Sequence, residues 1–206
     1  MSECSKKEGA GGVATAETRE ALVEGALATL REKGYAHASA REIAGRAGCN
    51  QALIFYHFGS VDGLLLAALD RVAELRRVRY QALVDESRNL KELVAAARTV
   101  FAEDLELGHT AVLVEMITAA QANAALRPEV AARLRPWRGF AAEALRGTPA
   151  ALLGRPEELA HGVVAMFLGL ELLAVLDDDP APADALFERA GSLSSLLDLF
   201  SLRRRS

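Results

Sequence analysis

The chain has 206 residues, of which 51% are hydrophobic and 25% are charged, and its formal net charge is −4. This length suits one large domain or a small domain fused to a larger one, and the apolar share excludes wholesale disorder. No uninterrupted apolar run reaches the roughly 18 residues of a membrane span, because Glu171 interrupts the longest candidate, 163–176. The first twenty residues lack a signal-peptide core, and Cys4 and Cys49 are too few for a disulfide framework. We therefore expect a cytoplasmic protein with no membrane partner.

Abundant Ala, Leu, Glu and Arg, with few β-branched runs, predict helices and no strands. Residues 1–15 are small and polar, which predicts a disordered tail. A first helix is expected to begin at Thr15 or Thr18, to carry apolar residues at intervals of four over 22–30, and to stop at Gly34.

Ser39 opens a second, short helix. Glu42 stands three residues later in the capping-box pattern S-x-x-E, and Gly48 ends the helix. A third short helix is predicted over Gln51–His57, and Gly59 follows as its break.

The rest of the chain keeps a helical pattern with short breaks. Helices are expected from Ser60 to about Asp85 and near Leu90–Leu107, Thr110–Ala125, Pro128–Arg146, Pro156–Leu176 and Ala183–Phe200. The fold class is therefore all-α, with about nine helices. Four arginines of the fourth helix, Arg71, Arg76, Arg77 and Arg79, are interpreted as a solvated face.

The charge distribution excludes a bulk basic surface for nucleic acid. Residues 1–60 hold seven Lys and Arg against seven Asp and Glu, and residues 61–206 hold 17 against 21. Between residues 39 and 58, however, the only formal charges are Arg41, Glu42 and Arg46. Any DNA-binding surface must therefore be local.

Residues 39–58 form such a local candidate, because helix, glycine turn and helix is a unit that projects its second helix into a major groove. The inward positions are Ile43, Ala44, Ala47, Cys49, Ile54 and Phe58. The outward positions are Arg41, Gln51, Ala52, Phe55 and Tyr56. Gln and Arg can hydrogen-bond to adenine and guanine, and apolar groups can contact the thymine methyl. The alternative is a plain helical corner with half-buried aromatic residues.

Several spaced motifs support the first reading: Gly34-Tyr35, Ser39-x-x-Glu42-Ile43-Ala44, Ala47-Gly48, Phe55-Tyr56-His57-Phe58 and Ser60-Val61-Asp62-Gly63-Leu64-Leu65. With them, residues 18–70 resemble the DNA-binding domain of the TetR family of bacterial transcriptional regulators. The resemblance implies a three-helix helix-turn-helix domain over 16–60, joined to a helical effector-binding and dimerisation domain over 61–206. It further implies a homodimer that binds a palindromic double-stranded DNA operator, usually represses, and is released by a small-molecule effector. No enzyme activity, cofactor or metal is implied.

By position, the resemblance assigns DNA contact to Ser39, Arg41, Asn50, Gln51, Ala52, Leu53, Phe55, Tyr56 and His57. Three residues depart from the family pattern. Phe55 replaces a Tyr and lacks its hydroxyl, Leu53 replaces a small or hydroxyl residue, and Val61 replaces a Lys. Since these changes remove phosphate contacts, we expect a DNA affinity and a salt dependence at the low end of the family.

The last two expected helices are apolar on more than one face, and in the resembled family they form the dimer interface. The candidate interface residues are Gly162, Ala165, Gly169, Leu172, Leu193, Leu196 and Leu197. A helix that is apolar on two sides must bury both. The alternative is an internal core helix of a monomer.

The candidate effector pocket lies among the middle helices and comprises Phe101, Glu115, Met116, Trp137, Phe140, Phe167 and Glu171. Glu115 and Glu171 are the most informative, because each interrupts an apolar helix and a buried carboxylate needs a partner or a raised pKa. They favour a cationic or hydroxylated ligand. For each residue, ordinary core packing is the alternative.

Two other classes of protein compete with a regulator. A helical small-molecule-binding protein without operator binding has the same core. A metal-dependent helical enzyme would use the E-x-x-H matches Glu106–His109 and Glu158–His161, although both lie at helix ends rather than on the inward face that a di-metal site requires. Cys49 is interpreted as a small core residue, with oxidation in the turn as a minor hypothesis.

Overall fold

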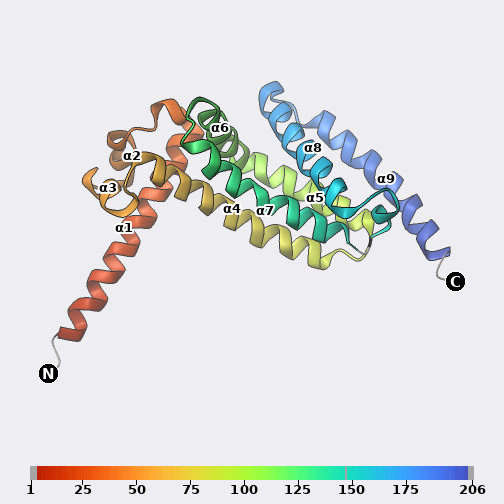
Figure 1. Ribbon diagram of the computed structural model, residues 1–206, viewed down its shortest axis with the longest axis horizontal. Helices are drawn as coiled ribbons and strands as arrows, with labels where there is room; N and C mark the ends of the chain where they lie inside the picture. The colour runs from red at the N-terminus through yellow and green to blue at the C-terminus, as the bar shows by residue number, and fades with distance from the viewer. Residues whose placement is uncertain (1–3, 147, 204–206) are drawn as a thin grey trace. The chain divides into compact units, whose positions relative to one another are not determined.

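The computed structural model describes the backbone of residues 4–146 and 148–203, and the side chains of residues 15–146, 148–150 and 153–197. This part of the chain is helical, without strands (Figure 1). Its α-helices are α1 (Cys4–Lys33), α2 (Ala40–Ala47), α3 (Ala52–Phe58), α4 (Val61–Glu86), α5 (Leu90–Glu106), α6 (His109–Ala122), α7 (Leu126–Leu145), α8 (Pro156–Asp177) and α9 (Ala181–Arg203). The short 3-10 helices η1 (Tyr35–His37) and η2 (Pro149–Leu152) lie between them. The all-α fold class is confirmed.

The chain divides into two compact units. Unit 1 contains residues 1–72 and 112–130, and unit 2 contains residues 73–111 and 131–206. Helices α4, α6 and α7 each contribute residues to both units. The helix-turn-helix segment therefore shares its unit with most of α6, which is distant in sequence.

In unit 1, the apolar stripe of α1 forms the core against α2, α3 and the first part of α4. Buried side chains of this core include Leu22, Leu27 and Leu30 of α1, Ile43 of α2, Ile54 of α3 and Leu65 of α4. Helix α1 begins at Cys4, upstream of the start expected at Thr15 or Thr18. No proline lies in residues 4–14, so the helix has no obligatory break there. Residues 1–3 of the expected tail lie outside the described part of the chain.

A set of hydrogen bonds that we call the Tyr35 clasp joins α6 and the residue after it to η1 and the start of α4. The backbone N–H of Tyr35 donates to Glu115 Oε2 at 2.7 Å. The Tyr35 hydroxyl donates to Asp62 Oδ1 at 3.0 Å, and Asn123 Nδ2 donates to Asp62 Oδ2 at 3.3 Å. Gly34 has φ of 74°, and a Cβ there would lie 2.8 Å from Glu115 Oε2. The clasp therefore requires glycine at position 34.

In unit 2, α5 lies beside α9, and α8 contacts both (Figure 1). Phe101 of α5, Ala174 of α8 and Phe187 of α9 form one buried cluster. A second cluster joins the start of α5 to α7, η2 and α8 through Leu90, Ala142, Leu145, Ala150 and Ala160.

Helix α8 leaves much of its apolar surface uncovered within this chain. By length and mean hydropathy it would suffice to cross a membrane, yet only 17% of its apolar 18-residue window is buried within this chain. Core helices of globular proteins can pass the same test, and the Glu171 side chain of α8 is fully buried inside unit 2. The exposed faces of α8 therefore need another covering.

The Tyr35 clasp leads to a prediction for Gly34→Ala. An L-residue at this positive φ, with its Cβ against Glu115, is expected to lower the free energy of unfolding by about 2 kcal/mol. Gly45→Ala is the matched control. It lies inside α2, where an added Cβ meets nothing within 4 Å, so the free energy should rise by about 0.5–1 kcal/mol. Urea denaturation measures both, and equal effects would contradict the assigned role of Gly34.

Candidate nucleic-acid interface and ligand site

The helix-turn-helix forms through local capping. Ser39 Oγ accepts a hydrogen bond from the N–H of Glu42 at 3.2 Å. Only this half of the expected capping box is present, because the Glu42 carboxylate instead contacts Lys33 Nζ at 2.8 Å and Arg46 Nε at 3.0 Å. Gly48 ends α2 in the left-handed region, with φ of 65°. At the start of α3, Asn50 Oδ1 accepts from the N–H of Ala52 at 2.9 Å.

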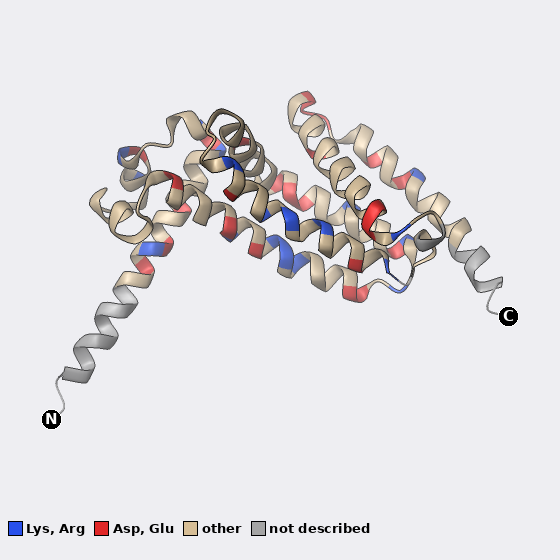
Figure 2. Ribbon diagram, viewed as in Figure 1, with Lys and Arg blue, Asp and Glu red and all other residues tan. Residues whose placement is uncertain are grey.

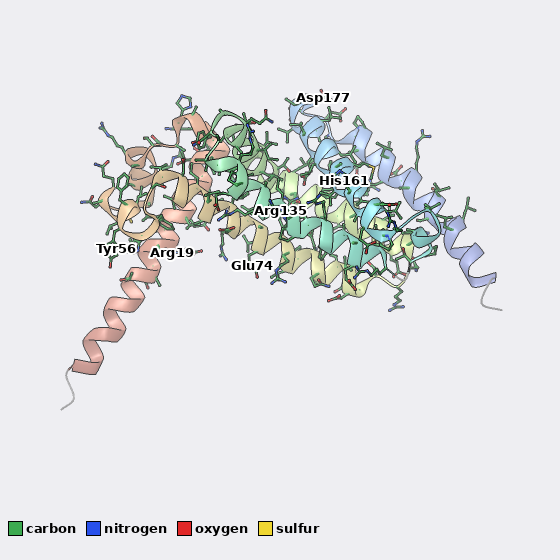
Figure 3. All side chains as sticks on the ribbon, in the orientation of Figure 1. Arg19, Tyr56, Glu74, Arg135, His161 and Asp177 are labelled. Carbon is green, nitrogen blue, oxygen red and sulfur yellow. The ribbon has the colours of Figure 1, made fainter. Side chains whose placement is uncertain are left out.

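Most of the residues assigned to DNA contact lie at the surface. The exposed ones are Ser39, Arg41, Asn50, Gln51, Ala52, Phe55 and Tyr56, whereas Leu53 and His57 are half-buried. Phe55 is 52% exposed and Tyr56 is 77% exposed. Figure 3 shows the Tyr56 side chain at the surface of this unit. Two large aromatic side chains on a seven-residue helix thus contribute little to the core and remain available to a partner.

The charge on this surface is sparse. Helix α3 contains no Lys, Arg, Asp or Glu (Figure 2). Arg46 is engaged by Glu32 at 2.7 Å and by Glu42, and these hydrogen bonds and charges raise its pKa. Arg41 is exposed and has no ion pair to a described residue. Arg41 is therefore the cation of this segment that is available to DNA.

A buried polar cluster occupies unit 2. We call it the Arg76 cluster, and it consists of Arg76 and Tyr80 of α4, Asp104 of α5, His109 of α6 and Glu171 of α8. Arg76 Nη2 lies 2.6 Å from Asp104 Oδ2 and 2.9 Å from Glu171 Oε1. Arg76 Nε donates to the Tyr80 hydroxyl at 2.9 Å, and that hydroxyl donates to Asp104. His109 Nδ1 lies 3.1 Å from Asp104 Oδ1. One guanidinium thus meets two carboxylates.

Burial and nearby charges shift the pKa values of Glu171 and Asp104 in opposite directions. Burial, strengthened by the charge of Asp104, raises the pKa of Glu171 to about 8, although Arg76 opposes the shift. Burial acts in the same direction on Asp104, but the hydrogen bond from His109 and the charge of Arg76 outweigh it and hold its pKa below the usual value. At neutral pH, Asp104 is therefore ionised and balances Arg76, and Glu171 mostly keeps a proton.

Two buried oxygen atoms of this region lack a hydrogen-bond partner among the described residues. They are Glu171 Oε2 and Thr110 Oγ1. Glu171 is 0% exposed and Thr110 is 2% exposed. The Thr110 hydroxyl nevertheless acts on Glu171, where it opposes the rise of the carboxyl pKa. Because an unpaired buried polar atom costs about 1–3 kcal/mol, Glu171 Oε2 is a place where a ligand or a water molecule would be stabilised.

Aromatic rings surround the cluster. The Tyr80 ring lies 5.4 Å from the Trp137 ring, 6.3 Å from Phe140 and 6.5 Å from Phe167. The Arg76 guanidinium lies 5.4 Å from the ring centres of both Tyr80 and Trp137, which is within the range of a cation–π interaction. These four rings are only half-buried, unlike Phe101 behind Phe167. The polar cluster is therefore surrounded by electron-rich rings that are partly exposed.

The structure brings together five of the seven expected pocket residues. Phe101, Trp137, Phe140, Phe167 and Glu171 all lie in unit 2. Glu115 and Met116 lie in unit 1, where Glu115 accepts the Tyr35 hydrogen bond and Met116 is 0% exposed in the core. They do not join the other five, because only the first three residues of α6 belong to unit 2.

Sequence reasoning missed most of the Arg76 cluster and wrongly placed Arg76 on a solvated face. Arg71, Arg77 and Arg79 are indeed on the surface, paired with Glu20, Glu74 and Glu103. Arg76 is only 7% exposed. A signal was present, because Arg76 and Tyr80 continue the spacing of Leu69 and Val72 along the buried stripe of α4.

The two E-x-x-H matches do not assemble into a metal site. His109 is bonded to Asp104 rather than to Glu106. Glu158 pairs with Arg155, and His161 lies exposed on α8 (Figure 3). Among the described residues, no group of three or more His, Cys, Asp and Glu side chains is placed to hold a metal ion.

The residues assigned to the dimer interface lie on open faces of α8 and α9. Gly162, Ala165, Leu172, Leu193 and Leu196 are exposed, and Gly169 and Leu197 are half-buried. Spacings of three and four residues place Gly162, Ala165 and Gly169 on one face of α8, beside the exposed Met166 and Leu173.

The protonation of the Arg76 cluster leads to a prediction. At about pH 6.5, Asp104→Asn should lower the free energy of unfolding by about 3–5 kcal/mol, because Arg76 loses its ionised partner in a buried site. Glu171→Gln should change it by less than about 1 kcal/mol, since Gln resembles the protonated carboxyl group.

The pH dependence has a definite sign. The pKa of Glu171 is raised from 4.5 to about 8, so the folded chain holds a proton that the unfolded chain has released in that interval. The free energy of unfolding of the wild type should therefore fall as the pH rises towards 8, and Glu171→Gln should lose this part of the slope. Denaturation curves measured across this range provide the test, and an unchanged slope would contradict the assignment.

Comparisons with known proteins agree with this fold. The profile described as "Bacterial regulatory proteins, tetR family" matches residues 22–68. An uncharacterized HTH-type transcriptional regulator of Mycobacterium tuberculosis is 30% identical over 151 residues, which are 73% of this chain and 76% of that protein.

Two solved structures share the fold. A TetR-family regulator of Rhodococcus sp. superposes with a TM-score of 0.72 at 20% identity, over 86% of this chain and 98% of that one. A transcriptional regulator of Saccharomonospora viridis in complex with choline superposes with a TM-score of 0.70 at 22% identity, over 86% and 95% of the two chains. With the match over α1–α4 and the long relative, these findings show that the chain belongs to the TetR family of helix-turn-helix transcriptional regulators.

Proposed function

We propose that this regulator is a cytoplasmic homodimer that represses transcription from a palindromic operator and leaves the DNA when a small molecule binds unit 2. The exposed surface of α3 carries this proposal. Phe55 and Tyr56 are at least half exposed beside the exposed Gln51, and none of the three has a role in the core that explains its place. We propose no enzyme activity and no cofactor.

Base recognition rests on few side chains. The Gln51 amide can bond to adenine and Arg41 to guanine, and Ala52, Leu53 and Phe55 can contact thymine methyl groups. Ser39, Asn50, Tyr56 and His57 can hold the backbone and fix the register. Arg46 is engaged by two carboxylates, so the phosphate charge that DNA binding neutralises is small. We therefore infer a weak dependence of affinity on salt.

A dimer follows from two separate requirements. A helix-turn-helix dimer reads two half-sites one turn of DNA apart, so a palindrome needs two copies. The faces of α8 and α9 also leave Met166, Leu173, Leu193 and Leu196 between 51% and 61% exposed. An isologous contact between two copies would cover both helices at once.

The effector proposal is supported by the Arg76 cluster and by a relative. The unpaired Glu171 Oε2 and the half-buried aromatic rings support the proposal of a site that a small molecule can complete. The Saccharomonospora viridis regulator, with the same fold, was solved with choline bound. A ligand-binding protein without operator binding is the competing function, and the sparse charge near α3 is the observation that favours it.

Selection of random duplex DNA with the purified protein tests operator binding. We expect an inverted repeat to be enriched at moderate salt. Gln51→Ala should weaken specific binding by about 1–3 kcal/mol and relax the preference at one base of each half-site. Gln81→Ala, an exposed glutamine of α4 in unit 2, should bind like the wild type. Failure to enrich any repeat, also at low salt, would favour the competing function.

A charge on α9 tests the dimer. Leu193→Glu should convert the protein to a monomer in sedimentation experiments, because a buried carboxylate without a partner is unfavourable in an apolar contact. Val78→Glu is a matched control, since Val78 is 57% exposed and Leu193 is 61% exposed. A dimer that persists in Leu193→Glu would place the interface elsewhere.

A further inference from the structure

We propose that the Arg76 cluster and its surrounding rings form a binding site for an organic cation, namely an ammonium group on a small apolar body. This inference rests on the proposed function and specifies the effector class of the same unit. The structure contributes three arguments, which are the charge balance of the cluster, the unpaired oxygen of Glu171 and the aromatic rings.

The charge balance favours a second cation. Arg76 is the guanidinium that contacts both Asp104 and Glu171. The second negative charge is cancelled by a proton that burial keeps on Glu171. An ammonium group beside Glu171 would replace this proton, so the carboxyl group would ionise without leaving a net buried charge.

Glu171 also has one carboxyl oxygen that is free to accept a hydrogen bond or to face a cation. Its Oε1 accepts from Arg76, whereas its Oε2 is buried without a hydrogen-bond partner among the described residues. Thr110 Oγ1 is buried and unpartnered in the same way. The Thr110 hydroxyl nevertheless acts on Glu171, because it lowers the pKa of that carboxyl group. The site therefore offers Glu171 Oε2 as the acceptor for a group that carries positive charge or N–H donors.

The rings match the same ligand class. Arg76 shows that a cation is stable over Tyr80 and Trp137, at 5.4 Å from each ring centre. Phe140 and Phe167 extend this group of rings and have no cation over them within the described residues. Quaternary ammonium groups bind to aromatic cages through the negative faces of the rings.

Anionic and neutral ligands fit less well. An anion would face two carboxyl groups, and the Nε and Nη2 donors of Arg76 are already engaged. A neutral ligand of the same shape would contact the same rings but would leave the proton on Glu171 and gain no cation–π attraction. Discrimination between a cation and its neutral isostere is therefore the decisive property.

The site also lies beside an element that belongs to both units. His109, bonded to Asp104, is the first residue of α6. The same helix carries Glu115, which binds the backbone of Tyr35 in unit 1.

Trp137 is the only tryptophan of the chain, so its fluorescence reports on this site directly. The probes are choline and benzyltrimethylammonium, with 3,3-dimethylbutan-1-ol as the neutral isostere of choline and benzoate as an anion. We expect saturable fluorescence changes with both cations, affinity for the neutral isostere at least about tenfold weaker than for choline, and no saturation with benzoate. No saturation with either cation up to about 10 mM, or equal affinity for choline and its isostere, would overturn the proposal.

Substitution of Glu171 separates binding from general packing. Glu171→Gln should lose at least about tenfold in affinity for choline while its affinity for the neutral isostere stays unchanged. Glu103→Gln, at a surface carboxylate of α5, is the matched control and should bind like the wild type. Equal choline affinity in wild type and Glu171→Gln would contradict the assigned role.

Binding should be linked to proton release. Choline should bind about tenfold or more tightly at pH 8 than at pH 6, because its binding requires the ionised form of Glu171. Arg76 and Tyr80 of α4, Asp104 of α5 and His109 of α6 also face this site, so Glu171→Gln shows how much of the dependence belongs to Glu171. A dependence that persists in Glu171→Gln would assign the proton to another group and overturn this step.

Operator binding is measured separately with the selected DNA. If the operator binds and the cations do not, this inference fails and the regulator function stands. If the cations bind and no operator is found, the ligand site stands and operator regulation fails.

Trp137→Phe, followed by calorimetry instead of fluorescence, should bind the cations more weakly, because Trp has the more negative ring face.

Discussion

In unit 2, Arg76 of α4 contacts carboxyl groups of α5 and α8. It also contacts a tyrosine of its own helix and the indole ring of α7. A buried guanidinium is tolerated only where its charge and its donors are satisfied, and here Asp104, Glu171 and Tyr80 satisfy it. Because these partners come from different helices, the geometry of the cluster fixes where those helices meet. The same requirement sets the protonation of Glu171, since one positive charge cannot balance two negative ones in a buried site.

The DNA-binding unit depends on a second polar set, of a different kind. The Tyr35 clasp contains no buried ion pair; it uses one backbone N–H, one phenol hydroxyl and one amide as donors. It holds α6 to η1 and to the start of α4. Helix α6 therefore has residues in both polar sets, with His109 in the Arg76 cluster and Glu115 in the clasp.

Large apolar side chains remain exposed on α3 and on the faces of α8 and α9, besides scattered ones such as Val78 of α4. Folding of a single chain does not account for either. A helix apolar on two sides and an exposed aromatic pair each call for a partner, and the two partners that we propose are a second copy and DNA. The low charge of α3 means that shape and apolar contact, more than phosphate attraction, would set its affinity for DNA.

The sequence by itself determined the all-α fold and the helix-turn-helix, because their signals are local. Ser39 caps a helix that starts one residue later, and Gly48 takes the left-handed conformation that ends it. The tertiary structure alone decided which partners the isolated polar residues bind. Glu115 and Glu171 look alike in sequence, since both interrupt apolar helices. The partner of Glu115 lies 80 residues away in unit 1, whereas that of Glu171 lies 95 residues away in unit 2. Periodicity shows that a side chain is directed inward, but the choice of a distant partner depends on how the helices pack.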